Sequence, residues 1–137
     1  MRIRTGLAVA ALATALSAPA VLVAASPASA APSSASLAIL PSAYADHHRV
    51  LVSGHFDGSS SYSLVTFSLK GDDGWATPDL GFTRNVVAVD GDFSYEALVH
   101  RSVLDEDYGV LNTDEVFARV TSPGDSSLRT NTVLGKF

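Results

Sequence analysis

Apolar side chains recur at every second position through most of the chain after residue 47. This alternation limits the possible folds more than any other feature of the sequence. A period of two is typical of β-strands with one buried face, because successive side chains point to opposite sides of a strand. The segments that carry the pattern are 48–56, 61–70, 84–90, 92–101, 115–122 and 128–137. No segment after residue 30 has a helical apolar stripe of useful length. We therefore predict an all-β fold.

The turns between these segments favour an antiparallel, two-sheet sandwich of about six to seven strands, and a small barrel is the alternative. Asp90-Gly91 predicts a two-residue type I′ hairpin, because both residues tolerate a positive φ. The polar run 57–60 predicts a second hairpin, which would join the strands on either side of it. Residues 31–46 are a leader in which 37–40 is either a first edge strand or part of a helical turn, and 47–137 is the sandwich domain.

The alternation also predicts which side chains face the core. One phase of each segment is apolar and the other is mostly polar, so the apolar phase is expected to point inward. The residues expected to face inward are Val50, Val52, Phe56, Val65, Phe67, Leu69, Phe93, Tyr95, Ala97, Val99, Val116, Ala118 and Val120.

Residues 1–30 have the organisation of a secretory signal peptide. Arg2 and Arg4 form a basic start, 7–25 is an apolar run of mainly Ala, Leu and Val, and 26–30 ends in a small-residue cleavage site. The alternative is a membrane anchor, which Pro19 and the small residues after the run disfavour. We expect cleavage before Ala31 and a secreted, extracellular protein.

Charge and cysteine content limit the classes of partner. Removal of residues 1–30 takes away two arginines and leaves seven basic residues against 14 acidic ones, a net charge of −7. Such a domain is repelled by nucleic acid and by anionic membranes. There is no cysteine, so disulfides, thiol-based metal sites and lipid attachment through cysteine are excluded.

Two stretches resemble bacterial immunoglobulin-like β-sandwich domains of secreted proteins. In 87–95 a strand ends in an Asp-Gly turn and an aromatic-Ser-aromatic strand follows, and 114–120 is similar to the penultimate strand of such domains. The disulfide and mid-strand tryptophan of antibody-type domains are missing, since Trp75 stands in a loop context. The resemblance implies architecture, and no function follows from it.

The acidic residues around 105–115 are the candidate cation site. Carboxylates of Asp105, Asp107 and Asp114 are the kind of ligand that Ca²⁺ prefers, although a solvated acidic loop is the more economical interpretation. His47 and His48 are neighbours on a strand and point to opposite faces, so they are not expected to chelate one metal.

Trp75 and Phe82 lie in a segment rich in Gly, Asp and Pro, and they are the candidate contacts for a partner. The competing interpretation is that Trp75 plugs the end of the sandwich, because a lone tryptophan in a small domain is usually well buried. From the sequence, the plug is favoured.

No catalytic motif is evident. A serine hydrolase needs a nucleophile elbow such as G-x-S-x-G, which is absent from the chain. We therefore expect a secreted, non-catalytic protein that binds an extracellular protein or glycan. The alternative is an inhibitor of an extracellular hydrolase that inserts the 71–85 segment, and a small hydrolase ranks third.

Overall fold

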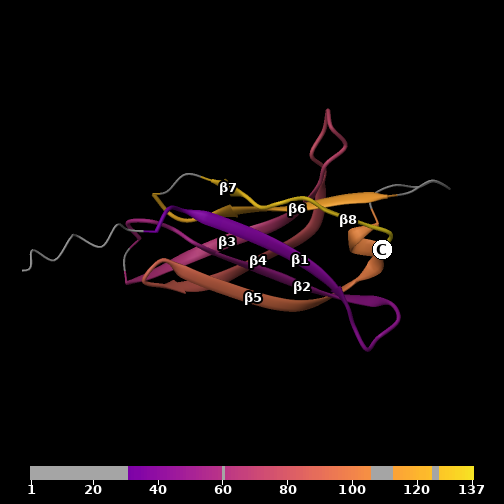
Figure 1. The fold of residues 1–137 in the computed structure, drawn as a ribbon, viewed down its shortest axis with the longest axis horizontal. Coiled ribbons are helices and arrows are strands. Elements are labelled where there is room, and N and C mark those ends of the chain that lie inside the picture. Colours follow the sequence, from indigo (N-terminus) through magenta and orange to yellow (C-terminus); the bar gives the residue numbers. More distant parts are fainter. Residues whose placement is uncertain (1–30, 60, 106–112, 125–126) are drawn as a thin grey trace, which may run out of the picture.

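The computed structural model describes residues 31–59, 61–105, 113–124 and 127–137, so the predicted signal peptide lies outside the described residues. Apart from one helical turn, every regular element of the described chain is a strand, which confirms the all-β class (Figure 1). The strands are β1 (Ser34–Pro41), β2 (His47–His55), β3 (Tyr62–Gly71), β4 (Asp79–Val89), β5 (Asp92–His100), β6 (Asp114–Thr121), β7 (Leu128–Arg129) and β8 (Val133–Gly135). One helical turn, α1 (Arg101–Leu104), follows β5.

All neighbouring strands are antiparallel, and they form one nearly closed sheet in the order β1-β2-β5-β4-β3-β6-β7, with β8 beside β6. The link between β4 and β5 is a single residue pair, Val89 with Asp92, because the two strands diverge directly after their turn. We call the two groups of extensively paired strands, β1-β2-β5 and β4-β3-β6-β7/β8, the two halves of the sheet, and their buried side chains form one core. Helix α1 contacts both β4 and β5, and its Leu104 is fully buried.

The core lies between the inner faces of the two halves, as the alternation predicts. All the residues expected to face inward are buried, except that Tyr95 and Ala97 are partly buried and pack against the core. Phe67 on β3 and Tyr95 on β5 meet across the interior with ring centroids 5.4 Å apart. The two halves are thus joined by direct aromatic packing.

The predicted Asp-Gly hairpin between β4 and β5 is confirmed. Asp90 has φ 51° and Gly91 has φ 87°, the two positive values that a type I′ turn requires. The backbone carbonyl of Gly91 also accepts a hydrogen bond from the N–H of Phe56 at 3.0 Å, which attaches the turn to the end of β2.

The predicted hairpin across residues 57–60 is wrong. β2 pairs with β1 and β5, whereas β3 pairs with β4 and β6, so the 57–60 connection leads from one half of the sheet to the other. A polar turn indicates that the chain changes direction there. Which strands then pair with each other depends on residues far away in the sequence.

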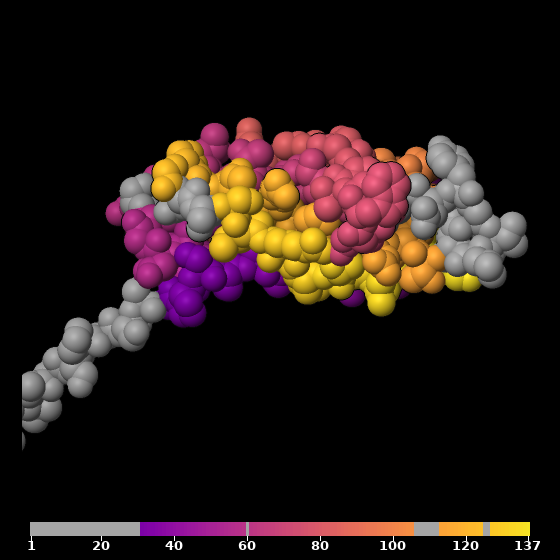
Figure 2. Space-filling model, turned by 90° about the horizontal axis from the view of Figure 1, so that it is seen from above, coloured from indigo at the N-terminus to yellow at the C-terminus, as the bar shows by residue number. Residues whose placement is uncertain are grey.

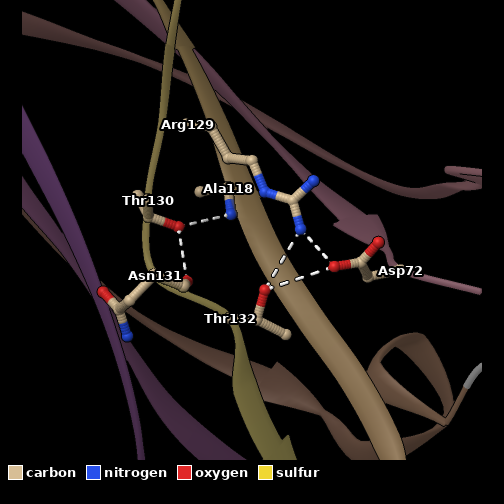
Figure 3. A network of polar contacts seen from close by, with 6 residues as sticks. All are labelled: Asp72, Ala118, Arg129, Thr130, Asn131 and Thr132. Carbon is tan, nitrogen blue, oxygen red and sulfur yellow. Dashed lines mark hydrogen bonds and ion pairs between the residues drawn. The ribbon is translucent and has the colours of Figure 1, made fainter. Parts of the chain in front are cut away.

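Both ends of the domain also differ from expectation. The strand interpretation of 37–40 is the right one, and β1 begins earlier, at Ser34. The expected final strand is split into β7 and β8 by residues 130–132. Thr130 interrupts the ladder because its side chain is buried, where its hydroxyl accepts the N–H of Ala118 at 2.8 Å and donates to the carbonyl of Asn131 at 2.9 Å (Figure 3).

The break between β7 and β8 places Asn131 at the seam where the sheet nearly closes. Its side-chain oxygen accepts the backbone N–H of Leu37 at 2.9 Å, and its side-chain nitrogen donates to the carbonyl of Leu37 at 3.0 Å. One amide side chain therefore supplies, at the middle of β1, the two bonds that a neighbouring strand would make. The described chain begins at one end of the molecule and terminates at the other (Figure 1).

We expect Asn131→Ala to lower the free energy of unfolding by about 1–3 kcal/mol, because both backbone groups of Leu37 lose their partner in a partly buried place. Urea denaturation measures the change, and hydrogen exchange of the Leu37 amide localises it. Asn85→Ala is the matched control, since the described bond of the Asn85 side chain, accepted from the Thr66 hydroxyl, is exposed. Unchanged protection of the Leu37 amide in Asn131→Ala would contradict the closure that we assign to this side chain.

Candidate functional site

The connection between β3 and β4 is a hairpin that projects from the body of the domain (Figure 1). Three backbone hydrogen bonds fold it: Gly71 N–H to Pro78 at 3.0 Å, Asp73 N–H to Ala76 at 3.1 Å, and Trp75 N–H to Asp73 at 2.8 Å. Gly74 has φ 76°, a value that the tight reversal at the tip requires and that glycine adopts without strain. The segment is therefore a folded finger, which we call the Trp75 hairpin (residues 71–79).

The base of the Trp75 hairpin is braced from the C-terminal strands. The carboxylate of Asp72 pairs with the guanidinium of Arg129 and accepts the hydroxyl of Thr132 at 3.3 Å (Figure 3). Arg129 is itself held over the ring of Phe117, 3.8 Å from its centroid. These contacts fix the direction in which the hairpin points.

A second brace lies at the start of β4. The ammonium of Lys70 is 2.6 Å from the carboxylate of Asp79, and the other Asp79 oxygen accepts the N–H of Gly81 at 2.9 Å. The hydrogen bond from Lys70, followed by that from Gly81, holds the pKa of Asp79 below its usual value. This brace is complete only while Asp79 is ionised, so it is present at neutral pH and lost as the pH falls through that lowered pKa.

Trp75 stands at the tip with 91% of its surface exposed, so the favoured interpretation of this residue as a plug is wrong. The reason is geometric: the hydrogen bonds and braces of the hairpin direct the ring away from the body of the domain, where none of the described side chains buries it. Figure 2 looks down on the projecting hairpin, whose rose-coloured atoms stand in front of the yellow and orange C-terminal strands.

Phe82, the second aromatic proposed as a contact, lies in the core. It is 8% exposed, its ring centroid is 6.3 Å from that of Phe67, and the Arg84 guanidinium covers it at 4.2 Å. The two candidates therefore have different environments: Trp75 is exposed to solvent, and Phe82 is buried in the core beside Phe67.

The candidate calcium ligands have different surroundings. Asp105 is exposed at the end of α1, Asp114 is fully buried at the start of β6, and Asp107 lies outside the described residues. An oxygen of Asp114 accepts the backbone N–H of Phe137 at 3.3 Å, which ties the C-terminus to β6. Within the described ranges, no three His, Asp or Glu side chains gather as metal ligands would.

The histidines point to different faces, as expected for neighbours on a strand. His47 lies between Tyr44 and His100, His48 packs on Phe137, and His55 is 2.8 Å from the Asp92 carboxylate. Tyr44, His47 and Leu98 line a shallow hollow of about 270 Å³. Sequence reasoning missed this hollow, because its residues come from the β1–β2 turn, the start of β2 and β5, which only the fold brings together.

No protein-family model matches the sequence, and neither a curated protein nor a solved structure matches it. In the part of the chain that the structure describes, no helix has the length and apolar character needed to cross a membrane.

Proposed function

We propose that this chain is an exported, non-catalytic β-domain that binds another extracellular protein through the Trp75 hairpin. The proposal rests on one observation: Trp75 is almost fully exposed at the tip of its hairpin. Backbone hydrogen bonds fold this hairpin, and two ion pairs hold it in place. Exposed tryptophans are costly in a domain that acts alone, and they are among the most frequent anchors of protein interfaces.

The order of the strands supports an immunoglobulin-like architecture for the domain. Strands β1, β2 and β5 lie together, β4, β3, β6 and β7 lie together, and the two groups share one residue pair at the β4–β5 turn. A two-sheet sandwich of this type keeps its connecting loops at the two ends, where they serve as contact surfaces. Export rests on the signal-like residues 1–30, and mass spectrometry of the secreted protein should find Ala31 at its N-terminus.

The shape of the hairpin favours a protein partner over a glycan. A single ring on a convex finger fits a concave pocket, whereas recognition of a sugar chain usually needs a platform or groove. The same shape supports a second candidate function, inhibition of an extracellular hydrolase, because an inhibitor of this kind inserts a rigid loop into the active-site cleft. Both functions need the same hairpin and differ only in the partner.

We expect Trp75→Ala to weaken partner binding at least about 30-fold while the free energy of unfolding changes by less than about 0.5 kcal/mol. The mature domain, immobilised, captures proteins from the extracellular fraction of its own culture, and titration of the captured protein gives the affinity. Because the chain has one tryptophan, its fluorescence reports directly on the hairpin: iodide should quench it readily in the unbound domain and poorly in the complex.

Tyr44→Ala is the matched control, because Tyr44 is also an exposed aromatic but stands on a different turn. This variant should bind like the unmodified domain. Equal capture by Trp75→Ala and the unmodified domain would rule out the hairpin as the contact. Inhibition of a panel of secreted hydrolases that is lost in Trp75→Ala would select the second candidate function.

A further inference from the structure

Two histidines lie side by side on the outer surface of β2 and β5. His47 and His100 are directly opposite residues in the register of these strands, and their ring centroids are 5.1 Å apart. Their neighbours point to the other side of the sheet, where His48 packs on Phe137 and Val99 is buried. Opposite residues of an antiparallel pair have adjacent Cβ atoms, so the two strands themselves hold these imidazoles together. We call them the His47–His100 pair.

The spacing of the His47–His100 pair suits a shared metal ion. A metal about 2.0–2.1 Å from one nitrogen of each ring lies about 3.2 Å from each ring centre. At a tetrahedral angle between the two ligands, the ring centres are about 5.2 Å apart, close to the 5.1 Å of the structure. The rings meet edge to face at 89°, so binding requires at most a turn of the His47 ring about its χ2 bond. This torsion is broad, and the turn leaves the ring centre almost in place.

Ser102 holds the second ring of the pair. Its hydroxyl oxygen lies 2.8 Å from Nδ1 of His100, which leaves Nε2 as the nitrogen for a metal. With a metal on Nε2, the neutral ring carries its proton on Nδ1 and donates it to this oxygen. The approach of the Ser102 backbone N–H to the same nitrogen, at 3.2 Å, is then given up. Histidines that bind metals commonly donate their other ring N–H in this way, which sets the tautomer and the direction of the ring.

The charges around the His47–His100 pair favour a cation. Asp46 precedes the first histidine and Arg101 follows the second, and their side chains form an ion pair at 3.9 Å. Because these two charges largely cancel, the field at the pair is mainly that of the whole domain. The mature chain has a net charge of −7, which raises the local concentration of cations.

We propose that His47 and His100 bind a divalent transition metal ion on this surface. Imidazole ligands suit Cu²⁺, Ni²⁺ and Zn²⁺, whereas Mg²⁺ prefers oxygen ligands and should not bind at this pair. Two protein ligands are fewer than the three or four of most zinc sites, so the metal keeps open positions. The hollow lined by Tyr44, His47 and Leu98 lies beside the pair and has space for the water that completes the coordination. The site shares no residue with the Trp75 hairpin, and the inference does not depend on the proposed function.

Calorimetric titration of the mature domain with ZnCl₂ and with CuCl₂ tests the proposal. One Zn²⁺ ion should bind per domain, and Cu²⁺ should bind more tightly. His47→Gln and His100→Gln should each lower the Zn²⁺ affinity at least about 30-fold, because only one imidazole then remains. His55→Gln is the matched control: His55 also lies on β2, 2.8 Å from the carboxylate of Asp92, and this variant should bind like the unmodified domain. Urea unfolding without metal verifies that the variants are folded.

Nuclear magnetic resonance locates the metal without any substitution. The chain has four histidines, so each ring can be followed separately. Zn²⁺ should shift the ring signals of His47 and His100 more than those of His48 and His55, and Mg²⁺ should shift none of them. No Zn²⁺ binding at about 1 mM metal would overturn the proposal. An equal loss of affinity in all three glutamine variants, or ring shifts confined to His48 or His55, would overturn it as well.

Discussion

Gly54→Ala is expected to lower the free energy of unfolding by about 3 kcal/mol or more, a large fraction of the total stability of a small domain. Gly54 occupies an inward-facing position on β2, between Ala35 of β1 and Phe93 of β5. A Cβ atom there would overlap the carbonyl oxygen of Ser34 and lie 2.6 Å from the Cζ atom of the Phe93 ring. A backbone oxygen cannot move aside as the end of a long side chain can, so the β1–β2 ladder must distort.

Urea denaturation followed by circular dichroism measures this change. Gly58→Ala is the control, because it adds the same methyl group at a glycine with nothing within 4 Å of the new atom. Gly58 has φ 74°, so this variant should lose only about 1 kcal/mol through backbone strain. If both variants unfold at the same urea concentration, the close approach at Gly54 is not what determines the stability of the strand.

Phe67→Ala is expected to lower the free energy of unfolding by about 3–5 kcal/mol. Phe67 is 1% exposed on β3, where it contacts Phe82 of its own half of the sheet and Tyr95 of the other half. The substitution removes buried apolar surface and leaves a cavity between the halves, which are joined in the described sheet by one residue pair at the β4–β5 turn and by the Asn131 side chain at the seam. Loss of packing here therefore acts on the association of the two halves as well as on β3.

Leu64→Ala is the control for Phe67→Ala, since Leu64 is on the same strand with an exposed side chain and should change the free energy of unfolding by less than about 0.5 kcal/mol. Thermal and urea unfolding should agree on the difference, and reductant should have no effect because the chain has no thiol. A loss below about 1 kcal/mol for Phe67→Ala would show that the halves do not depend on this contact.

The sequence was sufficient to predict the inner faces because alternation is a local property. On β6, for example, Val116, Ala118 and Val120 share one side of the strand and are all fully buried. Phe117 points to the opposite side and is buried there beneath the Arg129 guanidinium, which the alternation does not predict. The Asp90-Gly91 turn was predictable for the same reason, since two residues suffice to define a type I′ hairpin.

Strand partners and the seam were not predictable, because they depend on residues distant in the chain. The residues near 57–60 do not indicate that β2 pairs with β5. Likewise, the sequence around Asn131 does not indicate that its side chain bonds Leu37, which is 94 positions away. The exposure of Trp75 depends on Arg129 and Thr132, which brace its hairpin from the C-terminal strands. The average preference of tryptophan for the protein interior therefore led to the wrong prediction that Trp75 is buried.

The placement of the two ends of the domain has a mechanical consequence. β1 begins at one end of the molecule, whereas the chain terminates at the other, where Phe137 is bonded to Asp114 (Figure 1). Tension applied between these ends pulls β1 along its own axis, so that its eight residue pairs with β2 and the two bonds to Asn131 are loaded together in shear. Rupture then requires many bonds to fail at once, and the force that the domain withstands is set by its unfolding rate under load rather than by its equilibrium stability.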